Sequence, residues 1–330
     1  MQVRGKGWLY LVGLIGLMFS AQAMALCSVV TPTPVSFGSI SSMTVRTAAQ
    51  ASSSANAGLR CTSTLISLLV STDHFYATVT GSAQGGMVGP TGDVIGYTLY
   101  GNNTTSYPIT RNSQFDFGAA SGIAQTLGLV AGPGAKNLPL YVSSITGSNV
   151  AAGLYSETLS IAWNWNYCSG IGIGGICAGR DTGTGTSAMT VSMTVTNDCQ
   201  ITAPNISFGS APVVSGFTPV SAQTISITCT KGSAYTVGLS DGQNPVSVGG
   251  RRRMIAGTNY LAYDIFKSAG TTRWGSVGAA RRDSSTAEVN PGNGLGTGSQ
   301  IFTYNAKVYT DQPTPPAGTY TDNVVLDVGF

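Results

Sequence analysis

The chain has 330 residues, a formal net charge of +3 at pH 7 and only 9% charged residues. So small a positive excess argues against the basic surface by which nucleic-acid-binding proteins hold phosphates. Hydrophobic residues make up 42% of the chain, so the low charge content is typical of an extracellular β protein rather than a disordered one.

The first 25 residues have the features of a secretory signal peptide. Arg4 and Lys6 precede an apolar run from residue 8 to residue 18, and Ala23 and Ala25 supply the small side chains of a cleavage site. No later segment is apolar enough to cross a membrane. Cleavage after Ala25 would remove Arg4 and Lys6 and leave about 305 residues with a net charge of about +1. This length predicts two domains rather than one.

Three sequence elements recur in the same order in the two halves of the chain, which indicates a tandem duplication. A cysteine followed by a Ser-Phe-Gly-Ser motif occurs at Cys27 and residues 36–39, and again at Cys199 and residues 207–210. The other two elements are alternating runs at 95–100 and 261–266, and a Gly-x-Tyr-x-acid element at 153–157 and 318–322. We therefore expect residues 26–197 to form one domain and residues 198–330 to form the other.

All six cysteines lie in the predicted mature chain, and in an exported protein they indicate disulfides. Their spacing predicts the pairs Cys27–Cys61, Cys168–Cys177 and Cys199–Cys229. The first and third pairs are 34 and 30 residues apart and occupy equivalent places in the two repeats. A zinc site is the competing interpretation, but it is disfavoured because His74 is the single histidine and no Cys-x-x-Cys motif occurs.

Both halves consist of short alternating runs separated by Gly, Ser, Thr and Pro, with no amphipathic helix of any length. This pattern predicts an all-β protein made of two tandem immunoglobulin-like sandwiches. A complete sandwich of this kind has seven strands, but the second half provides six, near residues 206–208, 223–230, 234–239, 260–266, 301–309 and 320–330. The last of them carries Tyr320, Asp322, Val324, Leu326, Val328 and Phe330 on one face. A sandwich that lacks a strand exposes an apolar groove and unpaired backbone groups, which another chain must cover.

The stretch 187–199 is expected to supply the missing strand of the first domain. Its apolar side chains, Met189, Val191, Met193 and Val195, alternate strictly with Ser and Thr, as in a strand with one buried face. The last native strand of the first domain is expected near residues 155–166, and residues 187–197 follow it as the seventh strand. We therefore expect these side chains to fill the groove of the first domain, while the second domain stays open.

The second half resembles the spore coat protein U domain, the pilin fold of archaic (Csu-type) chaperone–usher pili. The first half matches well only at its opening, residues 27–61, and at residues 153–157. In the second half the matching elements are the strand and cysteine at 190–199, Asn-Ile-Ser-Phe-Gly at 205–209, Arg-Met at 253–254, the run at 261–266, Arg-Trp-Gly at 273–275 and Pro-Ala-Gly-Thr-Tyr-Thr-Asp at 316–322.

This resemblance implies a two-domain tip adhesin. In the family each pilin donates an N-terminal strand to the groove of the subunit ahead of it, but only Leu26 is expected to precede Cys27 in the mature chain. Such a subunit accepts a strand at its second domain and has none to donate, so we expect it at the distal end of a fibre on the cell surface. The implied partners are a periplasmic chaperone that holds residues 320–330, an outer-membrane usher and the next pilin.

Two apolar stretches, residues 118–134 and Cys168–Cys177, are candidates for adhesion, because loops at the free pole of a sandwich often carry function. We expect them to attach cells to apolar or abiotic surfaces and to promote biofilm formation. The alternative for these side chains is inward packing. The alternatives for the protein are a glycan-binding tip and a non-adhesive minor or initiator pilin. The candidate side chains are Ile171, Ile173, Ile176, Ile123, Leu127, Leu129 and Val130.

The remaining motifs predict no enzyme, cofactor or metal site. The Gly/Ile run at 170–175 has no strand–helix–strand unit around it, which a dinucleotide-binding turn requires. Asp73 and His74 are adjacent in sequence, whereas a catalytic triad is assembled by the fold. The arginine clusters at 251–253 and 281–282 are expected in solvated loops, paired with Asp283 and Glu288. Contact with a neighbouring pilin or an acidic surface is the alternative.

Overall fold

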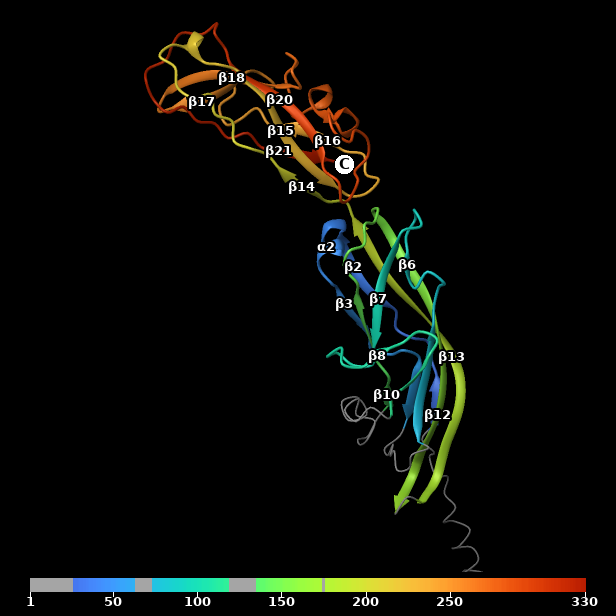
Figure 1. The fold of residues 1–330 in the computed structure, drawn as a ribbon. Coiled ribbons are helices and arrows are strands. Elements are labelled where there is room, and N and C mark those ends of the chain that lie inside the picture. Colours follow the sequence, from blue (N-terminus) through green and yellow to red (C-terminus); the bar gives the residue numbers. More distant parts are fainter. Residues whose placement is uncertain (1–25, 63–72, 119–134, 174–175) are drawn as a thin grey trace, which may run out of the picture.

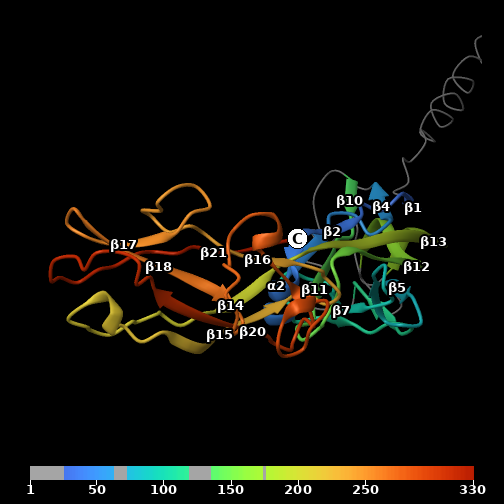
Figure 2. The same ribbon diagram turned by 90° about the horizontal axis from the view of Figure 1, so that it is seen from above.

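The chain forms two β-sandwiches that lie end to end (Figure 1), and a view from above shows the same two bodies joined near strand β14 (Figure 2). The computed structural model describes residues 26–62, 73–118, 135–173 and 176–330. The predicted all-β fold of two tandem immunoglobulin-like sandwiches is confirmed. None of the helices in these ranges has the length and hydropathy of a membrane span.

The first sandwich contains β1 to β13 and the short helix α2. Its small sheet has the order β1-β4-β10, and its large sheet has the order β2-β13-β12-β6-β7-β11-β3, with β5 beside β12, β9 beside β5 and β8 beside β7. The bounds are β1 Leu26–Val29, β2 Val35–Ser41, α2 Ser42–Thr47, β3 Ala51–Ser54, β4 Leu59–Thr62, β5 His74–Thr80, β6 Gly86–Val88, β7 Val94–Tyr100, β8 Pro108–Ile109, β9 Gln114–Asp116, β10 Ala135–Asn137, β11 Leu140–Ser144, β12 Gly153–Ile173 and β13 Ile176–Thr196.

Strand β13 completes the first sandwich. It runs antiparallel to β12 and parallel to β2, with which it pairs from Val191 to Thr196. Successive side chains of a strand point to opposite faces, so Thr190 and Thr194 face solvent while the apolar residues face the core. The four apolar side chains, at Met189, Val191, Met193 and Val195, are each at most 2% exposed.

The far part of β12 and β13 corrects one expectation. Residues 167–186 were expected to form a connecting loop, but the two strands stay paired as a long hairpin as far as Ile173 and Ile176. The Thr-Gly repeat of β13 suits a strand here because Thr182 and Thr184 face solvent. Gly183 leaves space for the Trp165 ring, since a Cβ on it would lie 2.3 Å from a ring atom. The sequence alone does not reveal this contact with Trp165, and a Gly/Thr tract by itself is typical of a loop.

The second sandwich has a five-stranded sheet, β14-β15-β20-β18-β17, and a three-stranded sheet, β19-β16-β21. Trp274 and Phe302 are fully buried in its core. The bounds are β14 Cys199–Thr202, η1 Val214–Gly216, β15 Val220–Cys229, β16 Thr236–Leu239, β17 Arg252–Ala256, β18 Asn259–Lys267, η2 Gly278–Ala280, β19 Arg282–Asp283, η3 Ser284–Thr286, β20 Gln300–Val308 and β21 Leu326–Gly329.

Two expected strands of the second sandwich differ from the structure. Residues 206–208 form no strand, although their counterpart β2 does. The local conformation is the same, since Gly38 and Gly209 have φ angles of 73° and 72°. Residues of β2 form a strand, with one register shift, because β13 pairs with them, and no described strand pairs with residues 206–208. Of residues 320–330 only β21 is a strand, while β14, β17 and the two-residue β19 form strands that we did not predict.

The three disulfides are the pairs that the spacing predicts. Cys27–Cys61 links β1 to β4, and Cys199–Cys229 links β14 to β15 in the same way. The Cys168–Cys177 disulfide links β12 to β13 near the end of their hairpin.

Candidate functional site

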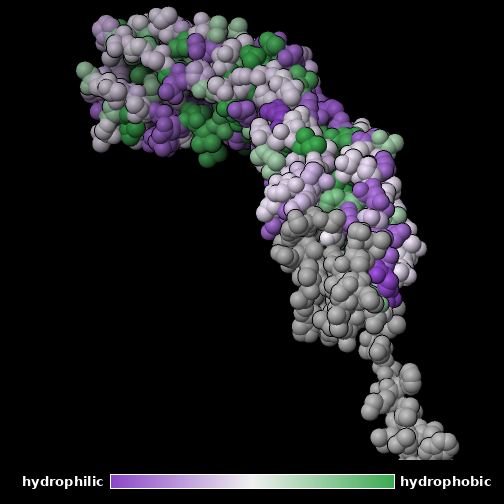
Figure 3. Space-filling view, turned by 60° about the horizontal axis from the view of Figure 1, so that its bottom comes forward, coloured by the Kyte–Doolittle hydropathy of each residue, from purple (hydrophilic) through white to green (hydrophobic). Residues whose placement is uncertain are grey.

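A groove with a volume of about 320 Å³ lies between residues 203–208 and residues 320–326 of the second sandwich. Figure 3 shows apolar side chains gathered at the surface of this sandwich. The groove therefore offers an apolar surface that another chain segment can bury. Its apolar lining consists of Ile206, Phe208, Ile225, Leu239, Met254, Ile265, Tyr304, Tyr320, Val324 and Leu326.

In the first sandwich the corresponding space is filled by β13. The strand pairings establish the correspondence, because Ile161 of β12 lies opposite Val79 as Leu326 of β21 lies opposite Leu239. On its other side β12 pairs with β13. Residues 320–329 have β16 on one side. On the opposite side, which corresponds to the side of β12 that pairs with β13, no described segment of the chain is paired with them. The groove thus has the position of one missing strand.

Backbone hydrogen bonds hold residues 320–326 as one wall of the groove. Thr321 and Ile255 of β17 exchange two such bonds, of 2.9 and 3.1 Å. Ser240, which follows β16, donates its N–H to the Val325 carbonyl at 2.8 Å and accepts from the Val325 N–H through its hydroxyl at 2.8 Å. Because β16 and β17 belong to different sheets, this wall spans the gap between them.

The opposite wall, residues 203–208, is held by side-chain packing. The Phe208 ring meets the Tyr263 ring edge-on, with 5.6 Å between centroids. Ile206 and Phe208 pack against the second core but stay only partly buried. Val35, the counterpart of Ile206, is fully buried beside β13. Burial of the remaining apolar surface of this wall would favour binding of a strand.

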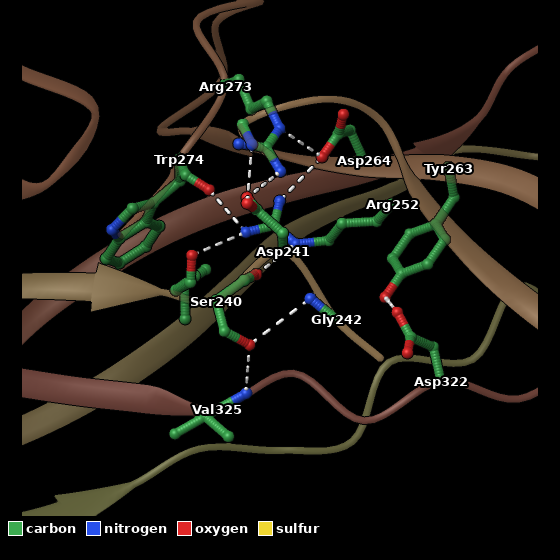
Figure 4. Close-up of polar contacts among 12 residues, drawn as sticks. Ser240, Asp241, Gly242, Arg252, Tyr263, Asp264, Arg273, Trp274, Asp322 and Val325 are labelled. Atoms are coloured by element: carbon green, nitrogen blue, oxygen red, sulfur yellow. Dashed lines mark hydrogen bonds and ion pairs between the residues drawn. The ribbon is translucent and has the colours of Figure 1, made fainter. Parts of the chain in front are cut away.

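A buried ion pair lies next to the groove (Figure 4). Arg252 and Asp264 are both fully buried, and their charged groups are 2.7 Å apart. The other N–H groups of Arg252 donate to the carbonyls of Ser240, Leu239 and Trp274 at 2.8–2.9 Å. Burial lowers the pKa of Arg252, since removal from water disfavours the charged form. The guanidinium thereby positions Ser240, which in turn holds the wall at Val325.

The acidic residue of the Gly-x-Tyr-x-acid element has the same local role in both sandwiches. Tyr263 donates its hydroxyl to the Asp322 carboxylate at 2.8 Å, as Tyr97 donates to Glu157 at 2.5 Å. Burial, together with the nearby Asp322 carboxylate, raises the pKa of Tyr263, so the phenol stays protonated and can donate. In the first sandwich Arg111 adds two hydrogen bonds to Glu157, of 2.7 and 2.9 Å.

The residues predicted to meet an incoming strand fall into three groups. Tyr320, Val324 and Leu326 line the groove. Val328 packs against the core beside it. Phe330 is 58% exposed and is not among the lining residues, because the regular alternation of β21 ends at Gly329.

Sequence reasoning missed the wall that carries Ile206 and Phe208 as part of the site. The signal was present in the repeated Ser-Phe-Gly-Ser motif, which sets Ile206 equivalent to Val35. Since Val35 flanks the strand that fills the first sandwich, its counterpart has to flank the open position in the second.

The proposed adhesive side chains lie outside what the structure describes. The backbones of Ile171, Ile173 and Ile176 belong to the β12–β13 hairpin, but their side chains are not described. The other candidates fall in residues 119–134, outside the described residues; they are Ile123, Leu127, Leu129 and Val130.

The expectation of solvated arginine loops is wrong for Arg252, which is fully buried against Asp264, and for Arg282, which is 3% exposed and lies in β19. The alternation of β17 turns Arg252 inward. Arg251 pairs with Asp311 at 2.7 Å rather than with the expected partners. Arg282 does pair with Glu288, at 2.9 Å.

His74 lies at the start of β5, where its ring contacts two neighbouring side chains. Its ring stacks on Tyr76 with 3.9 Å between centroids, and its Nε2 lies 3.0 Å from Asn164 Oδ1. Within the described ranges, no three or more His, Cys, Asp or Glu side chains are grouped so that they could hold a metal ion.

The first sandwich is completed by a strand of the same chain, and the second has an open groove at the position of one strand. The family model of the Spore Coat Protein U domain matches residues 16–162 and 185–327. The chain belongs to the Spore Coat Protein U domain family.

Two solved structures are similar to the chain to different degrees. A chain of the CsuC–CsuE chaperone–tip adhesion subunit pre-assembly complex of Acinetobacter baumannii Csu pili is 27% identical, with a TM-score of 0.61. The match covers 92% of this chain and 100% of that one. CfaE, the adhesive subunit of the CFA/I fimbria of enterotoxigenic Escherichia coli, is 10% identical over 91% of this chain and 93% of that one. Its TM-score of 0.27 is too low to carry an argument. No curated protein matches the chain by sequence. The predicted resemblance to archaic pilus tip adhesins is confirmed.

Proposed function

We propose that this protein is the tip adhesin subunit of an archaic chaperone–usher pilus, which attaches cells to surfaces and promotes biofilm formation. The observation that carries the proposal is the contrast between the two sandwiches. The first is closed by β13 of the same chain, and the second presents an open groove. Because the donor-like strand β13 is used inside the same chain, such a subunit would accept a strand without giving β13 to a neighbour, which suits the end of a fibre. The likeness to the CsuC–CsuE complex supports this position.

The open strand position of the groove suggests which partners would occupy it. A periplasmic chaperone would cover the wall at residues 320–326 during export, and an outer-membrane usher would exchange it for the donor strand of the next pilin. The first sandwich suggests the direction of that strand, since β13 is antiparallel to β12 and parallel to β2. The incoming strand would therefore run antiparallel to β21 and parallel to residues 203–208.

Adhesion is assigned to the pole of the first sandwich that lies farthest from the second. Figure 1 shows the β12–β13 hairpin extending to that end. The Cys168–Cys177 disulfide limits the freedom of the hairpin end, so Ile171, Ile173 and Ile176 would lose little entropy on contact with a surface. Each Ile or Leu buried on an apolar surface would contribute ~1.5–3 kcal/mol. Many fibres per cell would then act together.

Immunogold electron microscopy of isolated fibres tests the tip position. With label against the first sandwich, we expect one gold cluster at the free end of each fibre. Label distributed along the shaft would contradict a tip subunit.

Substitution of the three isoleucines tests the adhesive surface. Cells carrying Ile171→Ser, Ile173→Ser and Ile176→Ser should form normal fibres and lose attachment to polystyrene, because the apolar contact is removed. The matched control replaces Thr182 and Thr184 of the same hairpin, whose side chains already face solvent, by Ser. Unchanged attachment of the isoleucine variant, or inhibition of the native protein by free sugars, would favour a non-adhesive or a glycan-binding subunit.

A further inference from the structure

The two sandwiches meet in a polar joint beside residues 197–198, the two residues between β13 and β14. Lys231 Nζ donates to Asp93 Oδ1 at 2.5 Å, and Asn149 Nδ2 donates to the Leu295 carbonyl at 3.0 Å. The backbone of Ala151 also pairs with Lys231 in a parallel bridge. So short a link leaves the second sandwich seated directly on the end of the first.

The hydroxyls of Ser42 and Thr230 complete this joint at a distance of 2.6 Å, and the Arg46 guanidinium contacts the Gly296 carbonyl. Three segments of the first sandwich therefore form the seat: helix α2, the turn between β6 and β7, and residues 149–151. The seat is covered, since Ser42 is 6% exposed and Ala151 is 7% exposed.

The second sandwich carries the same three segments at its own far end. The 3-10 turn η1 follows the second Ser-Phe-Gly-Ser motif as α2 follows the first. The turn at residues 256–259 joins β17 to β18, just as the turn that carries Asp93 joins β6 to β7 in the first sandwich. Residues 314–316 correspond to 149–151, because Tyr320 donates to the Pro316 carbonyl as Tyr155 donates to the Ala151 carbonyl, both at 2.8 Å. Figure 1 shows β17 and β18 reaching the end that faces away from the first sandwich.

This second seat is uncovered and differs in chemistry from the first. Val213 is 46% exposed, and Thr258, Asn259, Thr314 and Pro316 are also exposed. Asn259 stands at the position of Asp93, so the carboxylate that holds Lys231 in the joint has no charged counterpart here. A partner would therefore meet small polar and apolar groups rather than an ion-pairing site.

We propose that this end of the second sandwich is the docking seat for the body of the following fibre subunit. The inference rests on the proposed function, since it requires a donor strand in the groove. A strand parallel to residues 203–208 would leave the groove at this end, as β13 leaves the first sandwich at Thr196 beside its own seat. With a link as short as residues 197–198, the donor's own sandwich is brought onto η1, the 256–259 turn and residues 314–316.

Site-specific photo-crosslinking in native fibres tests this seat. A photoreactive amino acid replaces Thr258 or Thr314 in the full chain, which is expressed with its own chaperone, usher and pilins. Asn323 at the groove is the positive control, and Thr224, an exposed threonine of β15, is the matched negative control. We expect covalent adducts with the next pilin from Thr258, Thr314 and Asn323, and none above background from Thr224.

The controls separate the two possible failures. Adducts from Asn323 alone, with Thr258 and Thr314 at the level of Thr224, would overturn the docking seat and leave the strand-accepting groove intact. A lack of adducts from Asn323 as well would overturn the proposed function, and the seat with it.

Discussion

At the scale of single residues, the buried Arg252 is what links the core of the second sandwich to its groove. Its charge is balanced by Asp264, and its remaining N–H groups donate to three backbone carbonyls. A buried ion pair adds little net stability, but loss of one partner is strongly destabilising, and without Arg252 the Asp264 carboxylate would keep Arg273, at 3.0 Å, as its charged partner. Arg252 is therefore a positioning residue whose removal should also disturb Ser240 and the wall it holds.

Arg252→Met should destabilise the second sandwich by about 3–5 kcal/mol. The reason is that Asp264 loses a charged partner and three carbonyls lose hydrogen bonds. Hydrogen exchange of β18 and β20 amides against urea concentration, in the full chain with a donor strand supplied to its groove, measures the effect on the second sandwich alone. The matched control is Arg251→Met, whose pair with Asp311 is exposed on both sides, and which should leave the midpoint unchanged. Equal effects of the two substitutions would contradict this account of Arg252.

Glu288 should make the second sandwich sensitive to acid. Partial burial raises its pKa, but hydrogen bonds from Ser268, Arg282 and the Thr303 N–H outweigh burial and lower the pKa to about 2. A carboxyl group with a pKa depressed below the unfolded value of about 4.3 contributes stability above that value. This contribution is lost as the pH falls from about 5 to 2.

Measurement of unfolding midpoints between about pH 7 and pH 2 tests this carboxylate. The native chain should be more stable than Glu288→Gln at neutral pH, and the difference should shrink towards pH 2. A difference that stays constant over this range would contradict a pH-dependent role of Glu288.

At the scale of elements, the part of β13 from residue 187 onward was predictable from sequence, because its alternation is uninterrupted there and its apolar residues face the core, whereas residues 176–186 were expected to be a loop. The wall at residues 203–208 was not, because strand character there depends on a partner. The same Ser-Phe-Gly-Ser motif is part of a strand at residues 36–39 and is irregular at residues 207–210. Likewise, the inward direction of Arg252 depends on its pairing in β17 with Tyr263, which composition does not reveal.

Met193→Ala should weaken the first sandwich by ~2–5 kcal/mol, since Met193 is fully buried and the substitution leaves a cavity where β13 fills the core. The unfolding of the second sandwich should not change. Hydrogen exchange of β2 and β12 amides measures the effect locally. Thr194→Ala, the exposed neighbour on β13, is the control and should behave like the native chain. Equal exchange in both variants would mean that β13 does not stabilise this sandwich.

At the scale of the whole molecule, one duplicated fold serves two purposes. The first sandwich keeps its groove filled by β13, and in the proposed function its far hairpin would contact a surface. The second keeps its groove open for assembly. The joint between them includes the ion pair of Lys231 and Asp93, and in the proposed fibre it would connect the two sandwiches without a flexible linker. The account therefore depends most on the claim that the second groove takes a strand.

Amide hydrogen exchange of residues 203–208 and 320–326 tests that claim most directly. The full chain is compared with a fusion in which a Gly/Ser linker after Phe330 carries a copy of residues 187–197. A control fusion has Ser at its four apolar positions. We expect residues 203–208 to be protected only in the first fusion, where backbone pairing on the open side becomes possible. Protection already present in the unfused chain, or absent from both fusions, would contradict an open strand-accepting groove.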